Sequence, residues 1–364
     1  MKRLMKVVCV FACIATAFAS GEGEKTPPKL SNKDLVAKYS VKITSTKDNT
    51  EQDALFYCPP EADPKNGTPQ PLLVGLHTWS TTFTLCTKYL PDCQKRKWIM
   101  VAPNFRGGNS RPAACASELA IQDVLDAVEY AKKHARVDET RIYLTGASGG
   151  GHMALMMAAK APGVWAAVSA WVPISNLTEW HQQTLGKKGK YDQMLEKCCG
   201  GAPGPTTEAE YRARSPIFHL PNAKELPMDI NTGIHDGYTG SVPVSQSLNA
   251  FNVLADANGL KDLRISDTDI QFMTAQQKIP DTLAQEMEKD VERKLTVLFR
   301  RKAGPVRITV FEGGHQDEPS ATFAWLARQQ KGQQVNFTVP AVLESLKRKR
   351  GSSEEVAPVG ETAK

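Results

Sequence analysis

The sequence predicts an α/β fold, a mostly parallel sheet with helices on both faces, because strand-like and helix-like segments alternate over most of the chain. Hydrophobic residues make up 41% of the 364 residues and charged residues 23%, which is enough apolar material for a large buried core. We expect one domain over 39–346, with insertions at about 181–216 and 262–301. Six apolar runs predict the main strands: 71–77, 98–102, 142–144, 165–170, 226–234 and 306–311.

The first residues have the pattern of a secretory signal. Basic residues precede an apolar run, 7–18, which is too short to span a bilayer, and Ala17-Phe18-Ala19 suits cleavage. We therefore expect a signal peptide over 1–19 and a secreted or periplasmic protein with no membrane contact after cleavage. An uncleaved anchor is the alternative. The segments 20–38 and 347–364 are polar, so we expect a disordered lead-in and a disordered tail.

The charge balance argues against nucleic acid as a partner. The net charge is +6, but three of the 45 Lys and Arg residues lie before residue 7, so the rest of the chain carries a positive excess of only three.

Cysteine usage agrees with export. Six cysteines follow the signal, and an even number in an oxidising compartment predicts up to three disulfides. Neither a CxxC pair nor an HExxH motif is present, so we expect no metal and no cofactor. The pairing is left open, although Cys86 and Cys93 are near enough in sequence to close a small loop. The six are Cys58, Cys86, Cys93, Cys115, Cys198 and Cys199.

The motif Gly146-Ala-Ser-Gly-Gly150 stands between a β-prone run and a stretch of helix formers. A serine at such an abrupt strand-to-helix turn is held in strained geometry, and the helix N-terminus directs its unpaired N–H groups at the reaction centre. We predict that Ser148 is a nucleophile. A purely structural Gly-Ser turn is the alternative.

Two later strand-end loops supply the partners that a serine nucleophile needs. Asp236 follows the strand 226–234, and His315 follows the strand 306–311. A neutral imidazole takes the serine proton and returns it to the leaving group, while a carboxylate orients the ring. The order Ser148, Asp236, His315 is typical of this chemistry on a parallel sheet. His235 is the strongest rival base, but it is adjacent to Asp236.

The tetrahedral oxyanion needs two donors. The Gly149 N–H, directly after the serine, is the natural first donor. The second is expected from the loop after His77, either the N–H of Thr78 or that of Trp79.

Aromatic and basic residues on the predicted site-facing loops suggest substrate contacts. Aromatic rings stack on sugars or hold acyl groups, and a guanidinium binds carboxylates. Packing of each tryptophan in the core is an equally open alternative. The candidate substrate-binding residues are Trp79, Arg106, Trp171 and Trp180.

Taken together, the motifs resemble the catalytic domain of prolyl oligopeptidase family serine hydrolases from about residue 39 to 328. The resemblance implies an α/β-hydrolase fold and the triad named above. Thr78-Trp79 stands where many relatives have Gly after the His, and the short lead-in leads us to expect no β-propeller. The motifs are Leu76-His77, Asn104-Phe-Arg-Gly107, Gly146-Ala-Ser-Gly-Gly-Gly151, His235-Asp-Gly237 with Gly240-Ser-Val-Pro243, and Gly313-Gly-His315.

Three functions follow from this pattern. The first is a secreted serine hydrolase that cleaves an ester, of a carbohydrate or a small acyl group. The second is a peptidase that acts on short peptides. The third belongs to another class, a non-catalytic binding protein with a hydrolase-like fold, and the intact triad argues against it. The expected ligand is a small molecule, a glycan ester or a peptide, and the oligomeric state is left open.

Overall fold

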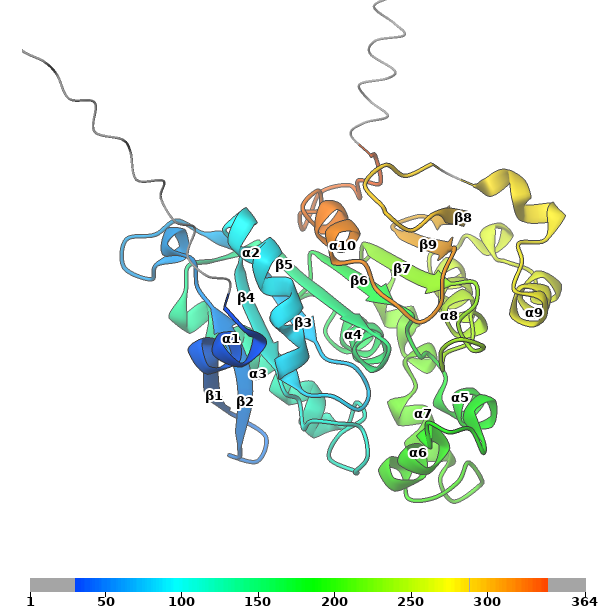
Figure 1. Ribbon diagram of the computed structural model, residues 1–364, viewed down its shortest axis with the longest axis horizontal. Coiled ribbons are helices and arrows are strands. Elements are labelled where there is room, and N and C mark those ends of the chain that lie inside the picture. The colour runs from blue at the N-terminus through cyan, green and yellow to red at the C-terminus, as the bar shows by residue number, and fades with distance from the viewer. Residues whose placement is uncertain (1–29, 288, 340–364) are drawn as a thin grey trace, which may run out of the picture.

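A nine-stranded, mostly parallel sheet is the framework of the computed structural model, which describes residues 30–287 and 289–339 (Figure 1). The strand order is β1-β2-β4-β3-β5-β6-β7-β9-β8, and the six strands from β4 to β9 pair in parallel. The predicted α/β class is therefore confirmed. The strands are β1 (Ser40–Thr44), β2 (Glu51–Tyr57), β3 (Gln70–Leu76), β4 (Ile99–Pro103), β5 (Val137–Ala147), β6 (Ala167–Trp171), β7 (Met228–Gly233), β8 (Val297–Ala303) and β9 (Val306–Phe311).

Helices cover both faces of this sheet. Helices α3, α4 and α8 pack on one face, and α1, α2 and α10 pack on the other. The helices are α1 (Asn32–Tyr39), α2 (Leu90–Arg96), α3 (Glu118–His134), α4 (Gly149–Lys160), α5 (Leu177–Thr184), α6 (Tyr191–Cys199), α7 (Glu208–Arg214), α8 (Ser245–Ala257), α9 (Asp267–Gln276) and α10 (Pro319–Leu326).

Strand alternation explains why both faces are apolar. In β3, Leu72 and Val74 face the core beneath α3 and α4, while Leu73 faces the opposite core beneath α2 and α10. Successive side chains of a strand point to opposite faces, so a continuous apolar run can be buried on both sides. Both faces of the sheet are therefore buried at its centre. A functional site can form only at the ends of the strands and in the loops that follow them.

Helix α3 shows how the local sequence forms a helix. The Ser117 hydroxyl accepts a hydrogen bond from the Ala120 N–H at 3.2 Å, which caps the first turn. Ile121, Val124 and Val128 lie on one buried stripe at helical spacing. The cap and the apolar stripe together account for this helix.

Two predicted boundaries are wrong. The segment 20–38 was expected to be a disordered lead-in, but its last residues belong to α1, which begins with a capping box between Ser31 and Asp34. The segment 262–301 was expected to be one insertion, but its last residues form β8, an edge strand antiparallel to β9. The predicted signal peptide and the tail from 347 lie outside the described residues.

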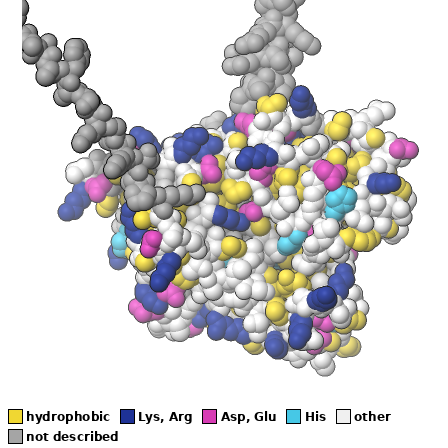
Figure 2. Space-filling view, in the orientation of Figure 1, with side chains coloured by type: hydrophobic (Ala, Val, Ile, Leu, Met, Phe, Trp, Pro, Cys, Tyr) yellow, Lys and Arg dark blue, Asp and Glu magenta, His cyan; other side chains and the backbone are white. Residues whose placement is uncertain are grey.

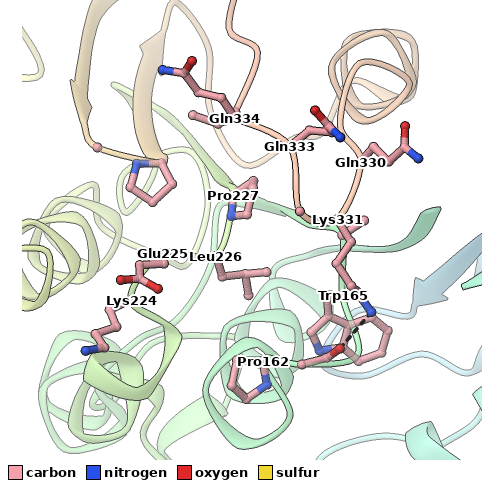
Figure 3. A pocket seen from close by; sticks show the side chains of 16 residues that line it. Pro162, Trp165, Lys224, Glu225, Leu226, Pro227, Gln330, Lys331, Gln333 and Gln334 are labelled. Atoms are coloured by element: carbon pink, nitrogen blue, oxygen red, sulfur yellow. Dashed lines mark hydrogen bonds between the residues drawn. The ribbon is translucent and has the colours of Figure 1, made fainter. Parts of the chain in front are cut away.

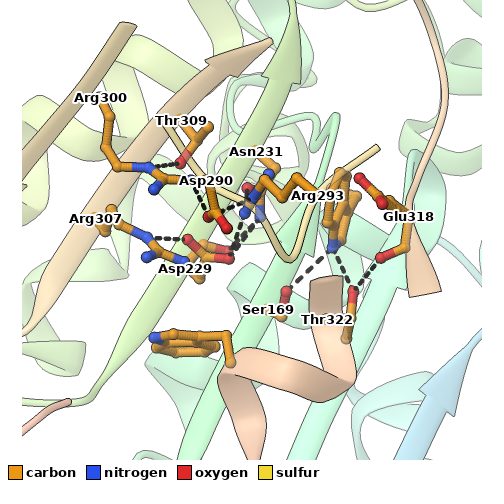
Figure 4. A network of polar contacts seen from close by, with 12 residues as sticks. Ser169, Asp229, Asn231, Asp290, Arg293, Arg300, Arg307, Thr309, Glu318 and Thr322 are labelled. Atoms are coloured by element: carbon orange, nitrogen blue, oxygen red, sulfur yellow. Dashed lines mark hydrogen bonds and ion pairs between the residues drawn. The ribbon is translucent and has the colours of Figure 1, made fainter. Parts of the chain in front are cut away.

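A buried ion network holds the edge strand β8 on the sheet (Figure 4). Asp229 on β7 binds Arg307 Nε through Oδ1 at 2.7 Å and Arg293 Nη2 through Oδ2 at 3.2 Å. Asp290 binds Arg300 of β8 at 2.9 Å. Each charged group is almost fully buried, so each depends on its partners for solvation.

All six described cysteines are free thiols. The expectation of disulfides therefore has no support in the structure. Cys115 and Cys198 nevertheless touch, because the Cys115 thiol donates a hydrogen bond to the Cys198 sulfur. Burial raises the pKa of Cys115, whereas this hydrogen bond lowers that of Cys198.

The surface has mixed character. Figure 2 shows Lys and Arg side chains interspersed with Asp and Glu over the face drawn. Within residues 30–287 and 289–339, no helix combines the length and the apolar character that crossing a bilayer requires.

Candidate active site

Ser148 lies at the sharp turn between β5 and α4, as the motif predicts. Its backbone has φ 57° and ψ −119°, a strained conformation for a residue with a side chain. The Ser148 N–H donates to the Trp171 carbonyl at 2.9 Å, which ties the turn to the end of β6. A Cβ on Gly146 would lie 2.4 Å from the Gly150 oxygen, so the strand and helix approach this closely only because glycine stands there.

Asp236 and His315 meet at the ends of two neighbouring parallel strands, β7 and β9. His315 Nδ1 lies 2.7 Å from Asp236 Oδ2. The other carboxylate oxygen, Oδ1, accepts the N–H groups of Gly237 at 2.8 Å and Val242 at 3.1 Å. Asp236 is only 2% exposed, so its orientation is set by these bonds. An Nδ1–H donated to the carboxylate leaves the other ring nitrogen of His315 free to accept a proton.

Ser148 and His315 line one cavity of about 280 Å³ at the carboxyl edge of the sheet. Among the described residues, the Ser148 hydroxyl makes no hydrogen bond to the His315 ring. Catalytic hydrogen bonds are often long in the absence of substrate and tighten only when it binds. The cavity is lined by Thr78, Trp79, Ser80, Thr81, Lys88, Ala147, Ser148, Val172, Tyr191, His315, Gln316 and Asp317.

Two backbone N–H groups lie side by side next to the nucleophile. A Cβ on Gly149 would lie 2.4 Å from the Trp79 nitrogen. Neither the Gly149 nor the Trp79 N–H donates a hydrogen bond to any described residue. Of the two expected second donors, the Trp79 N–H is thus the one that lies against Gly149, and both N–H groups are open to a ligand.

The imidazole of His77 supports the loop that carries these donors. Its Nδ1 lies 2.9 Å from the Thr78 oxygen, and its Nε2 lies 2.9 Å from the Asn104 oxygen. The ring is fully buried and stacks on Phe105 with centroids 4.0 Å apart. Burial lowers the pKa of His77. This histidine holds the Thr78–Trp79 loop and does not face the cavity.

The rival base His235 is engaged elsewhere. Its Nε2 lies 2.6 Å from Glu312 Oε1, and its Nδ1 lies 3.1 Å from Gln277 Oε1. The hydrogen bond to Glu312 raises the pKa of His235. His152, one turn into α4, bonds the Arg214 carbonyl at 2.8 Å, and burial lowers its pKa to about 4. Of His152, His235 and His315, only His315 makes a side-chain hydrogen bond to Asp236.

The prediction that Arg106 binds substrate is wrong. Its guanidinium binds Asp48 through Nη1 at 2.7 Å and Asp123 through Nε at 2.8 Å. Arg106 is 6% exposed and does not line the catalytic cavity. The motif loop places this arginine in a structural ion network, whose hydrogen bonds to Asp48 raise its pKa.

Two of the three tryptophans are also misassigned. Trp171 is buried, donates to Thr322 Oγ1 at 2.7 Å and lies beneath Arg293. Trp180 is buried against Trp79, with ring centroids 4.7 Å apart. Only Trp79 contributes to the cavity wall, so both others form the packing behind the site.

Residues that the sequence did not indicate complete the cavity wall. Tyr191, at the start of α6 in the insertion 181–216, lines the same cavity as the serine. Lys88, from the 3₁₀ segment Phe83–Tyr89, and Asp317 supply charge. Asp317 lies two residues after His315, and this proximity was the only signal that could have identified it. Lys88 had none.

A larger cavity of about 610 Å³ lies at the other end of the parallel strands, where they begin (Figure 3). Its lining includes Ala166, Leu226-Pro227 and Gly304-Pro305, which precede β6, β7 and β9. The triad residues follow the carboxyl ends of their strands, so this cavity is separate from the candidate active site. Ligands of open α/β sheets bind at the carboxyl ends of the strands.

Comparison with known proteins agrees with this geometry. The model of the prolyl oligopeptidase family matches residues 88–275, which is more than half of the chain. Acylamino-acid-releasing enzyme 1 of Oryza sativa subsp. japonica is 25% identical over 176 residues, 43% of this chain and 22% of that protein.

Solved structures share the fold at low identity. The acylaminoacyl peptidase of Pyrococcus horikoshii aligns with a TM-score of 0.57 and 17% identity, over 89% of this chain and 48% of that one. A puromycin-hydrolysing peptidase of Mycobacterium tuberculosis aligns with a TM-score of 0.52 and 18% identity, over 82% and 39% of the two chains. This chain thus spans less than half the length of each relative. By its sequence and its α/β-hydrolase sheet, the chain belongs to the prolyl oligopeptidase family.

Proposed function

We propose that the protein is a serine hydrolase that cleaves amide bonds in short peptides or acylated amino acids. The observation that carries the proposal is the 2.7 Å contact between His315 Nδ1 and Asp236, beside a strained Ser148 in the same cavity. The family and the peptidase relatives support the amide substrate over other acyl compounds.

In the proposed mechanism each of these residues has one step. The Ser148 oxygen attacks the carbonyl carbon while the free nitrogen of His315 takes the hydroxyl proton. The Gly149 and Trp79 N–H groups stabilise the oxyanion of the tetrahedral intermediate. His315 then gives its proton to the leaving amine, and an acyl-enzyme remains on Ser148. Water, activated by the same histidine, releases the acid and restores the serine.

Hydrolysis of an ester, our first interpretation of the sequence, has less support. It rested partly on tryptophans as a stacking surface, and Trp171 and Trp180 are buried behind the site. Acyl transfer from an ester would use the same triad.

Labelling with a fluorophosphonate probe tests the nucleophile. We expect the wild type and a Ser110→Ala control, at an exposed loop position, to be labelled, and Ser148→Ala to be unlabelled. Equal absence of label in all three proteins would favour the binding-protein hypothesis.

A substrate panel then tests the amide. It compares p-nitrophenyl acyl esters, N-acyl amino acid amides and Xaa-Pro amides. We expect hydrolysis of amides as well as activated esters. Turnover of esters alone would contradict the peptidase proposal.

Export is proposed on sequence grounds alone. The basic residues and apolar run before Ala19 support it. Expression of the full chain followed by mass spectrometry of the mature N-terminus tests it, and a mature protein that begins at Ser20 is the expected result.

A further inference from the structure

The catalytic cavity contains an ion pair that the proposed mechanism does not use. Lys88 Nζ lies 2.6 Å from Asp317 Oδ2, and both side chains line the cavity with Ser148 and His315. Apart from His315, these are the only titratable charged side chains among its lining residues. A charged pair beside a nucleophile bears on which substrates enter.

The 3₁₀ segment holds Lys88 in place. The next residue, Tyr89, is buried, and a Cβ on Gly75 of β3 would lie 3.0 Å from its ring. Strand β3 leads directly into the loop that carries Trp79. The backbone of Lys88 is thus anchored on the same strand as the second oxyanion donor.

The hydrogen-bonding capacity of the pair is unequal. Asp317 Oδ2 accepts both Lys88 Nζ, at 2.6 Å, and the Tyr89 hydroxyl, at 3.3 Å. An ammonium group has three donors, and the contact with Asp317 uses one. The side chain of Lys88 is also the more open of the two, 29% exposed against 18% for Asp317. What the pair offers to a ligand is therefore positive charge with free N–H groups.

The pair is partly exposed, at 29% for Lys88 and 18% for Asp317, and ion pairs open to solvent contribute only about 0–1 kcal/mol to folding. The hydroxyl groups of Thr78 and Thr81 line the same cavity and lie 3.0 Å from each other, so this part of the lining is polar. The part of the wall around Lys88 thus suits an anionic oxygen group better than an apolar side chain.

We propose that Lys88 is a specificity residue that binds a carboxylate of the substrate, so that the enzyme prefers short peptides or acyl amino acids with a free carboxylate near the scissile bond. This inference rests on the proposed hydrolase function. The carboxylate is either the C-terminal group of a short peptide or an acidic side chain, and both present the same chemistry to an ammonium.

Matched substrates separate these sources. One pair consists of an acyl dipeptide with a free C-terminus and the same dipeptide as its amide. The other consists of two dipeptide amides that differ only in Glu or Gln at one position. The ratio of kcat/KM within each pair measures the preference, and the pair with the larger ratio identifies the source. A neutral p-nitrophenyl ester serves as a reference substrate.

Three variants test Lys88. In Lys88→Met we expect the preference for the carboxylate substrate to fall about tenfold, mainly through KM, because one charge-assisted contact is lost. Lys88→Arg should restore most of it. Lys95→Met, at an exposed position on α2, is the control and should retain the wild-type ratio. Turnover of the neutral ester by Lys95→Met should equal that of the wild type within about twofold, and in the Lys88 variants it should fall less than turnover of the carboxylate substrate.

Asp317→Asn gives an independent readout. Removal of its charge frees the Lys88 ammonium, so we expect the preference for carboxylate to rise and its dependence on ionic strength to steepen.

The two proposals fail in different ways. If the wild type hydrolyses the neutral ester but does not distinguish carboxylate from amide, or if Lys88→Met slows every substrate equally, the Lys88 subsite is refuted and the hydrolase stands. If no substrate is hydrolysed and Ser148 is not labelled, both are refuted.

Discussion

At the scale of single residues, Gly149 is where a methyl group would act most directly on the chemistry. A Cβ there would lie 2.4 Å from the Trp79 nitrogen and 3.0 Å from its Cβ, so Gly149→Ala must separate the two oxyanion donors. We expect kcat to fall by about 10²–10³, the usual cost of one such donor. Gly163→Ala is the control because nothing lies within 4 Å of the added atom. Steady-state kinetics of both variants would decide, and equal rates would contradict the assigned oxyanion site.

A second residue-scale prediction distinguishes the two candidates for the general base, His315 and His235. His315 contacts Asp236, whereas His235 contacts Glu312 and Gln277. We expect His315→Gln to lower kcat by about 10³ or more and His235→Gln to change it by less than about tenfold. Measured kcat values for the two variants test the assignment, and the reverse order would assign the base to His235.

Residue types and order sufficed to predict the elbow and the order of the triad, because strained backbone and proton transfer demand particular residues. They did not reveal Lys88, since a lysine on a short 3₁₀ segment has no distinguishing pattern and its role depends on what folds beside it. The same reason explains the error for Arg106. A motif located this arginine on a loop near the site, but its partners Asp48 and Asp123 are distant in sequence.

At the scale of elements, α6 shapes the site and is tied to the loop before α3. The Cys115 thiol contacts the Cys198 sulfur near the end of α6. We expect molecular oxygen or oxidised glutathione to convert this pair to a disulfide, with loss of both thiol protons and two electrons to the oxidant.

Peptide mapping by mass spectrometry before and after reduction tests this expectation. A linked peptide that joins residues 115 and 198 is the expected product. Buried Cys86 and Cys93 serve as an internal comparison and should remain thiols, because burial raises the pKa of both and they make no such contact with each other. Alkylation of both Cys115 and Cys198 after oxidant treatment would contradict it.

Elements whose side chains are apolar could be predicted from sequence, and the others could not. Strand β8 was missed because it is rich in arginine and lysine, yet Arg300 is buried against Asp290. Helix α1 was missed because the stretch reads as polar, although Ser31 and Asp34 cap it. In both elements the stabilising partners are polar, so hydrophobic periodicity gives no signal.

At the scale of the whole molecule, the buried ion network links the edge of the sheet to its centre (Figure 4). Burial alone would raise the pKa of Asp229, but the charges of Arg307 and Arg293 outweigh it and lower that pKa to about 2. The unfolded carboxyl has a pKa of about 3.9. A depressed pKa stabilises the fold above the unfolded value, and that stabilisation is lost as pH falls from about 5 toward 2.

We therefore expect the free energy of unfolding to decrease over this acidic range. Asp229→Asn should lower it by roughly 3–5 kcal/mol at neutral pH, because two buried guanidinium groups lose their counter-charge. Asp53→Asn, which removes the exposed pair with Lys42, is the control and should change it by less than about 1 kcal/mol. Urea unfolding at pH 7 measures both, and equal small effects would contradict the role given to Asp229.

The origin of the cavity walls has an evolutionary consequence. The triad and the oxyanion donors come from the strand ends and loops of the sheet, whereas Tyr191 comes from the insertion 181–216. The buried side of that insertion belongs to an apolar cluster that also contains Trp79, so Leu195 and Tyr211 support the loop of the second oxyanion donor. Substitutions confined to Tyr191, at the start of α6, can therefore reshape one wall of the site while the packing behind the reactive centre is kept. Selectivity in this protein is free to diverge faster than reactivity, and a library confined to the cavity-lining start of α6 would be the economical route to new substrates.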